Sequence, residues 1–155
     1  MISHAGNQIF RTYVAADLMT HRFAYCAAAA AAAFAWSAPA LADPCEGALA
    51  ARGTTFSGVV HYVGDGDGLC VGPVGRPDRW VEVRLADFYA PELHEAGGSD
   101  AKRRLERIAM GKALVCRAGR RSYDGVVAIC TIGGRPLGSV LRAAGGVEGG
   151  RGRPR

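Results

Sequence analysis

Hydrophobic and polar residues are arranged along the chain in short patterns that predict β-strands. Residues 54–63 (TTFSGVVHYV) are rich in β-branched and aromatic side chains, which favour a strand. Residues 80–85 (WVEVRL) alternate apolar and polar positions, the two-residue period of a half-buried strand. Between them, residues 69–74 are apolar and follow a glycine–aspartate turn at 64–68. These segments together predict a three-stranded meander.

A helix is expected after this meander. Apolar side chains recur on one face of residues 101–110 and arginines occupy the other faces, as in an amphipathic helix. The apolar positions are Leu105, Ile108 and Ala109. Ser99 or Asp100 is the expected N-terminal cap, and Gly111 is expected to end the helix.

The remaining pattern completes a small fold. Residues 113–118 and 125–132 predict two strands joined by a short polar link, and residues 137–144 predict a final helix. The order predicts a mainly β (α+β) fold, a five-stranded OB-fold barrel with a helix between strands 3 and 4 and a short C-terminal helix. A different small α+β sheet is the alternative that the pattern leaves open.

The N-terminal region has the features of a secretory signal peptide. A charged start at residues 19–22 precedes an alanine-rich apolar run at 23–36 and an A-x-A site at 40–42. We therefore predict a signal peptide at 19–42 and a periplasmic or secreted protein without stable membrane association. Residues 1–18 are not expected to belong to the folded protein. An uncleaved membrane anchor is the alternative, although the run is short for a bilayer span.

Charge adds a modest preference for polyanions. Loss of the first 42 residues removes Arg11, Arg22 and Asp17, and lowers the net charge from +5 to +4. A small positive charge favours polyanions without specifying one. We expect a folded, monomeric domain at 43–148 and a disordered basic tail at 149–155. The arginines of that tail, Arg151, Arg153 and Arg155, are expected to be solvated, with a phosphate-attracting arm as the alternative.

Four cysteines remain after the predicted cleavage, and an even count in a small exported chain implies disulfides. Three connectivities are possible. The preferred pairing is Cys116–Cys130 with Cys45–Cys70, because Cys116 and Cys130 fall in the two strands of an expected hairpin. Zinc binding is disfavoured because the chain has no C-x-x-C spacing.

Three segments carry candidate chemistry, and their order is more specific than any one of them. They are residues 63–68 (VGDGDG), residues 84–92 (RLADFYAPE) and residues 120–128 (RRSYDGVVA). An aspartate turn, then R-L-x-x-x-x-x-P-E, then a helix, then a hairpin with tyrosine at its bend, resembles the staphylococcal-nuclease (thermonuclease) family. The resemblance spans residues 56–147 and implies an OB fold that hydrolyses phosphodiester bonds of nucleic acids or nucleotides with calcium.

The resemblance assigns a role to five positions. Asp67 falls at the first calcium ligand and Asp65 at the neighbouring acidic position, while Ala90 offers a backbone carbonyl to the ion. Arg84 falls at an arginine that clamps phosphate, and Glu92 at the glutamate that orders the attacking water. The chemistry is reasonable, because a hard cation binds phosphate oxygen and an arginine neutralises phosphoryl charge.

The chain also departs from the family pattern. A second calcium-binding aspartate is replaced by Tyr89, the second arginine by Gly125, and the threonine after the aspartate turn by Gly68. Loss of a charged ligand weakens a calcium site, and loss of a phosphate-clamping arginine slows the reaction. The residues considered as replacements are Asp87, Arg120 and Arg121.

Two functions follow as hypotheses. The first is a weakened calcium-dependent nuclease, and the second is a non-catalytic OB-fold module that binds nucleic acid. In a purely structural interpretation, Asp65 and Asp67 only form a turn. Arg84 then pairs with Asp67 or Glu92 to hold the mouth of the barrel.

Overall fold

The computed structural model describes residues 43–149. The expectations for residues 1–42 and for the tail from residue 150 onward lie outside this range. None of the helices among the described residues is both long and apolar enough to cross a membrane. The elements are β1 (Thr55–Val63), β2 (Gly68–Gly72), η2 (Pro77–Arg79), β3 (Val81–Leu85), α2 (Gly98–Ala109), β4 (Ala113–Arg121), β5 (Val126–Ile132), β6 (Arg135–Pro136) and α3 (Leu137–Ala143).

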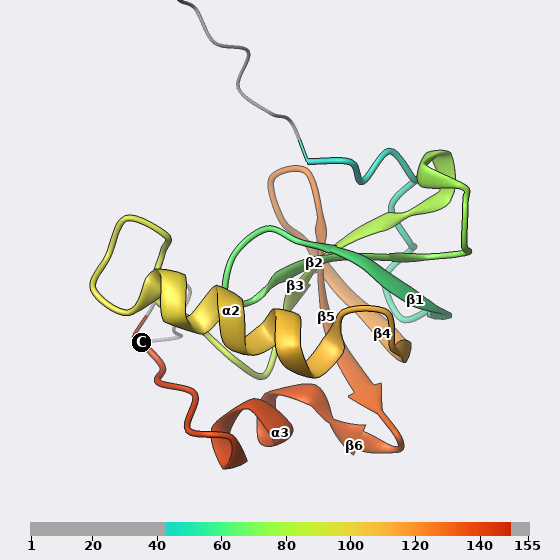
Figure 1. Ribbon diagram of the computed structural model, residues 1–155. Helices are drawn as coiled ribbons and strands as arrows, with labels where there is room; N and C mark the ends of the chain where they lie inside the picture. The colour runs from blue at the N-terminus through green and yellow to red at the C-terminus, as the bar shows by residue number, and fades with distance from the viewer. Residues whose placement is uncertain (1–42, 150–155) are drawn as a thin grey trace, which may run out of the picture. The chain divides into compact units, whose positions relative to one another are not determined.

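Five of the strands form a closed barrel (Figure 1). Strands β1, β2 and β3 form an antiparallel meander, and β1 also pairs with β4, which pairs with β5. A parallel pairing between β3 and β5, with Leu85 opposite Ala128, closes the circle. The predicted OB-like barrel, with a helix between its third and fourth strands, is confirmed. The two-residue strand β6 extends the sheet beyond β5 and was not predicted.

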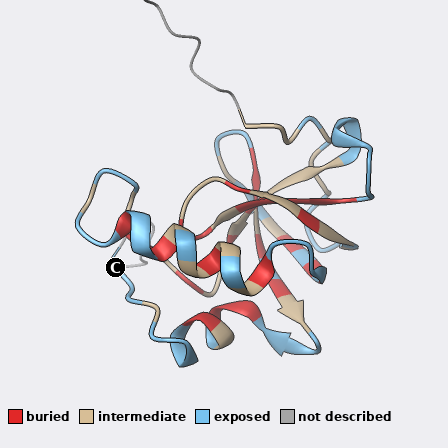
Figure 2. Ribbon diagram, viewed as in Figure 1, coloured by how far each residue is buried: buried red, intermediate tan, exposed pale blue. Residues whose placement is uncertain are grey.

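The core follows the two-residue period of the strands. In β4, Leu114, Cys116 and Ala118 are buried, while Val115 and Arg117 face solvent. Figure 2 shows buried residues along the barrel side of α2 and exposed residues on its outer side. The two helices add Leu105, Ala109, Leu137 and Leu141 to the same core.

The start of α2 corrects the sequence analysis. Neither Ser99 nor Asp100 caps the helix; the N-cap is Gly97, in the left-handed region with φ of 87°, and the helix begins at Gly98. A Cβ atom at Gly98 would lie 2.0 Å from the carbonyl oxygen of Glu92. The glycine pair therefore lets the helix start against the preceding loop, and this close approach decides where the helix begins. Gly111, with φ of 70°, follows the end of the helix as expected.

Strand β4 is longer than predicted. It continues to Arg121, which pairs with Val126 after a shift in register between Ala118 and Arg121. A Cβ atom at Gly119 would lie 2.7 Å from the carbonyl oxygen of Val127, so only glycine fits this bulge without displacement. The hairpin bend is consequently confined to the residues after Arg121.

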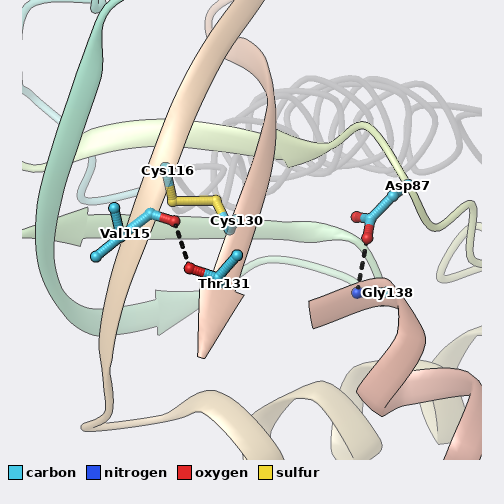
Figure 3. Close-up of a disulfide and its surroundings, with 6 residues drawn as sticks. All are labelled: Asp87, Val115, Cys116, Cys130, Thr131 and Gly138. Carbon is cyan, nitrogen blue, oxygen red and sulfur yellow. Dashed lines mark hydrogen bonds between the residues drawn. A yellow bond between two sulfur atoms is a disulfide. The ribbon is translucent and has the colours of Figure 1, made fainter. Parts of the chain in front are cut away.

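Both preferred disulfides form. Cys116 and Cys130 are directly paired residues of β4 and β5, with a Cα–Cα distance of 4.0 Å (Figure 3). Cys45 is joined to Cys70 of β2 with a Cα–Cα distance of 5.5 Å. The second bond fastens the segment before β1 to the barrel wall.

Candidate functional site

The turn between β1 and β2 is held in one conformation by its own side chain. The Oδ1 atom of Asp65 accepts hydrogen bonds from the backbone N–H groups of Asp67, at 2.9 Å, and Gly68, at 2.5 Å. Gly66 lies where a Cβ atom would come within 2.3 Å of the Ala90 Cβ and 2.6 Å of the Ala101 Cβ. The turn is thus packed between the loop after β3 and helix α2.

Asp67 connects this turn to the loop after β3. Its Oδ2 atom accepts a hydrogen bond of 3.1 Å from the Ala90 N–H, and its carbonyl accepts one of 2.8 Å from the Leu85 N–H. Asp67 is the one buried charged residue in the described part of the chain, with 2% of its surface exposed. Burial, together with the neighbouring Asp65 carboxylate, raises the pKa of Asp67 to about 7, although Arg84 acts to lower it.

Arg84, near the end of β3, bridges two carboxylates. Its Nε atom lies 3.3 Å from Asp67 Oδ1, and its Nη2 atom lies 3.3 Å from Glu92 Oε1. The side chain of Arg84 is 36% exposed and that of Glu92 is 26% exposed. The three residues to which the resemblance assigns ligand, phosphate clamp and water-ordering base therefore lie together, with two of them accessible to solvent.

Beside Arg84 there is a small cavity of about 70 Å³ between β3 and the β4–β5 hairpin. Its lining is Asp65, Gly68, Glu82, Val83, Arg84, Ser122, Tyr123, Asp124 and Gly125. Three of these residues are acidic, and Arg84 is the only cation among them. Oxygens of Asp43, Glu82 and Asp124 lie within 4.8 Å of one another. The cavity is therefore negative beside Gly125, the position to which the resemblance assigns a second arginine.

Glu82 is the residue of this cavity that the sequence analysis missed. Burial raises its pKa to about 7, and the neighbouring Asp43 and Asp124 carboxylates add to the shift. A signal was available, because Glu82 and Arg84 are two residues apart in β3 and so point to the same side of the sheet. The sequence could not predict that Asp43 lies near Glu82. Its position depends on the Cys45–Cys70 bond, which holds the segment before β1 against β2.

The positions that depart from the family pattern have other partners. The Tyr89 hydroxyl donates to the Ala86 carbonyl over 3.2 Å. A Cβ atom at Gly125 would lie 3.1 to 3.3 Å from the Glu82 carbonyl oxygen, Cγ and Cδ. Glu82 therefore lies against the position from which a second arginine would extend. Gly68 is likewise close-packed, since a Cβ atom there would lie 2.9 Å from Asp65 Oδ1.

The proposed replacements are not drawn into the site. Asp87 Oδ2 accepts a 3.1 Å hydrogen bond from the Gly138 N–H, and Figure 3 shows its carboxylate directed at the start of α3. Arg120 and Arg121 are exposed at the end of β4 and do not line the cavity. None of these three residues supplies a missing ligand or clamp.

Both carboxylate oxygens of Asp67 are already engaged by donors, Oδ1 by Arg84 and Oδ2 by the Ala90 N–H. Oxygen ligands suit a hard cation, and Asp65 Oδ1 is occupied in the same way by the N–H groups of Asp67 and Gly68. Within residues 43–149, the groups of three or more potential ligand atoms centre on Asp43 and do not include Asp67. Affinity for calcium decreases when a site has fewer charged ligands, so these residues would hold calcium weakly.

Neither family models nor curated protein sequences match this chain.

Proposed function

We propose that the chain is an exported phosphodiesterase of the thermonuclease type, which hydrolyses nucleic acid slowly and with calcium. The contact of Arg84 with both Asp67 and Glu92, at 3.3 Å each, carries this proposal. It joins a buried carboxylate, a cation and a partly exposed carboxylate on an OB-like barrel. Export is supported by the signal-like segment at 19–42 and by two disulfides, which persist in oxidising compartments.

Each residue has a chemical task in this proposal. The Arg84 guanidinium neutralises charge on the phosphoryl oxygens, for which its planar fork is suited. Glu92 orders the attacking water and accepts its proton. Asp67 and Asp65, with the Ala90 carbonyl, would hold calcium, which when bound supplies positive charge for a phosphate oxygen.

The rate of hydrolysis should be low because Gly125 stands where the resemblance assigns a second phosphate-binding arginine. An arginine that stabilises a transferring phosphoryl group is worth about 10³–10⁵ in rate. Gly125 supplies no such group, and Glu82 beside it adds negative charge that repels phosphate.

The direct test is cleavage of single-stranded DNA by the purified full chain in millimolar calcium, with EGTA as the control. We expect calcium-dependent cleavage that falls by at least about 10²-fold in Glu92→Gln, the order expected for a general base. Equal cleavage by Glu92→Gln would assign the activity elsewhere. Absence of cleavage together with no rise in Tm at millimolar calcium would refute the proposal.

A non-catalytic binding module is the second candidate, favoured by the engagement of Tyr89 and by Glu82 beside Gly125. Restoring the groups that the resemblance expects distinguishes the weak nuclease from the binding module. Tyr89→Asp with Gly125→Arg returns the missing groups, and Glu82→Gln frees the new arginine from a carboxylate. Strong nuclease activity in this triple variant, with none in the parent chain, would identify a disarmed site. The double variant without Glu82→Gln is the matched control and should be less active.

A further inference from the structure

Helix α3 is joined to the loop that leads from β3 to Glu92. The Asp87 Oδ2 atom accepts a 3.1 Å hydrogen bond from the Gly138 N–H, and the Asp87 carbonyl accepts one of 2.7 Å from Arg142 Nη1. Figure 3 shows the first of these bonds at the start of the helix. Asp87 is therefore held by α3 through both its side chain and its backbone.

The loop and the helix are fitted closely where they meet. A Cβ atom at Gly138 would lie 2.4 Å from the Asp87 carbonyl oxygen and 2.7 Å from Asp87 Cγ, so only glycine fits there without displacement. The separation of the loop from α3 is thus set by contact at the helix backbone and not by a flexible side chain.

The next two residues of the loop are held from the same side. Phe88 is 1% exposed, and the Arg142 guanidinium lies over its ring, with Cζ 6.0 Å from the ring centroid. The Tyr89 carbonyl accepts a 3.0 Å hydrogen bond from the Gly149 N–H. Gly149, which the sequence analysis placed in the disordered tail, therefore has a defined position. Three consecutive loop residues are fastened to α3 or to the segment that follows it.

The candidate site continues directly from these three residues. The Ala90 N–H donates to Asp67 Oδ2 over 3.1 Å, and Glu92 Oε1 lies 3.3 Å from Arg84 Nη2. Glu92 is only five residues beyond Asp87, so a shift of the loop at Asp87 would move it. A misplacement of about 1 Å in a reacting group can cost about 10²-fold in rate.

One oxygen of Asp87 indicates that this geometry is kept at a cost in stability. Its Oδ1 atom is buried and has no hydrogen-bond partner among residues 43–149. Buried polar atoms are normally paired, and an unpaired one lowers stability. Strain that a fold tolerates is found most often at functional sites. Stability alone therefore does not account for a carboxylate at this position.

We propose that Asp87 is a positioning residue, which sets the place of Ala90 and Glu92 by fixing their loop to α3, and this rests on the proposed function. Asp87 acts through the loop and touches neither the phosphate nor the ion. The competing role is general stabilisation of the fold, in which case loss of Asp87 would lower the Tm without a specific effect on the site.

Cleavage kinetics of the full chain on oligothymidine in calcium test this role. Asp87→Ala removes the acceptor for the Gly138 N–H, and we expect kcat to fall by about 10- to 10²-fold. KM should change much less, because Arg84 still binds phosphate while the water-ordering base is displaced. Asp87→Asn keeps an oxygen at the acceptor position and should restore most of kcat. An asparagine variant as impaired as the alanine variant would overturn the proposal.

A matched control loses stability elsewhere in the barrel. Val71 is fully buried in β2 and pairs with Val81, the first residue of β3, whereas the loop follows the last residue of β3. Val71→Ala should lower the Tm, because it leaves a cavity in the core, but kcat should be kept well below that Tm. A fall in kcat like that of Asp87→Ala would reduce Asp87 to a general structural role and overturn the proposal.

Amide exchange, measured by NMR without calcium, separates positioning from catalysis. The Val60 N–H, which donates to the Lys112 carbonyl over 3.0 Å, reports on the barrel. In Asp87→Ala, the Ala90 N–H should quicken relative to Val60 by about 2- to 10-fold, the factor for one net hydrogen bond. Equal acceleration of both amides overturns the positioning role, even if the parent chain cleaves DNA. Selective acceleration at Ala90 in a chain without cleavage removes the enzymatic function and leaves the positioning of the loop.

Discussion

At the scale of the residue, Arg84 is the side chain on which the proposed chemistry depends. The aspartate turn alone is a weak signal, but Arg84 touches both carboxylates to which the family resemblance gives a role. The resemblance predicted Asp67, Arg84 and Glu92 as site residues, because each lies in a short contiguous motif of the sequence. The acidic residues around the site were not predicted, because Glu82, Asp43 and Asp124 are distant in sequence and come together only in the folded barrel.

Arg84→Lys tests whether the fork of Arg84, and not only its charge, is used. Lysine keeps one positive charge but cannot contact Asp67 and Glu92 through separate nitrogens. We expect calcium-dependent DNA cleavage to fall by about 10²–10³-fold, the order seen when one transition-state donor is removed. The Tm measured by circular dichroism serves as the folding control. Full activity with lysine would mean that the charge alone suffices.

Glu82→Gln tests the acidic cavity through the pH dependence of stability. The folded pKa of about 7 lies above the ordinary value of 4.5, so the folded state binds more protons between these values. The contribution of Glu82 to stability therefore falls as pH rises through this window. The glutamine variant should match the parent near pH 4.5. It should become more stable by on the order of 1 kcal/mol or less at pH 8, because exposure of Glu82 weakens the repulsion. Urea unfolding at both pH values measures the difference, and a constant offset would contradict it.

At the scale of the element, apolar periodicity predicted all five barrel strands and both helices. The errors lie at ends and irregularities, such as the start of α2 at Gly98 and the extension of β4 to Arg121. These depend on close approaches between segments that are distant in sequence, as at Gly98 against the Glu92 carbonyl. Strand β6 was not predicted because its two residues are too few to show the apolar–polar alternation of a strand.

Gly66→Ala tests the packing of the turn between β1 and β2. The added methyl group would lie 2.3 Å from Ala90 Cβ and 2.6 Å from Ala101 Cβ, both in well-packed surroundings. Overpacking of this kind costs about 1–3 kcal/mol. We expect a loss of that size in urea unfolding and weaker binding of calcium, because Asp67 would move away from Ala90. Gly53→Ala provides the comparison. Nothing lies within 4 Å of its Cβ position, so only its φ of 85° opposes alanine.

At the scale of the whole molecule, closure of the barrel and two disulfides define the domain. The order of elements predicted the OB-like topology but left another small α+β sheet open, and the parallel pairing of β3 with β5 decides between them. The pairing of the cysteines was a preference until Cys116 and Cys130 were found directly opposite each other.

Removal of the Cys45–Cys70 bond should destabilise the domain without unfolding the barrel. The bond closes a loop of 25 residues, for which loop-closure entropy predicts a cost of about 2–4 kcal/mol. Cys45→Ala with Cys70→Ala should lower the free energy of unfolding by this amount. Because the bond also holds the segment that bears Asp43, the variant should lose part of the pH dependence attributed to Glu82. Retention of that dependence would show that Asp43 is positioned by other contacts.

If the predicted signal peptide is removed, the position of Asp43 would couple that cleavage to the electrostatics of the cavity. Cleavage after Ala42 would turn Asp43 into the amino terminus and create an α-ammonium, with an ordinary pKa of about 7.7–8.0. Its own carboxylate already lies within 4.8 Å of the carboxylates of Glu82 and Asp124. Such processing would therefore add a cation to the acidic group formed by Asp43, Glu82 and Asp124. The precursor, lacking that cation, should bind a mononucleoside bisphosphate more weakly than the processed protein at pH 6.5, and the difference should shrink at pH 9.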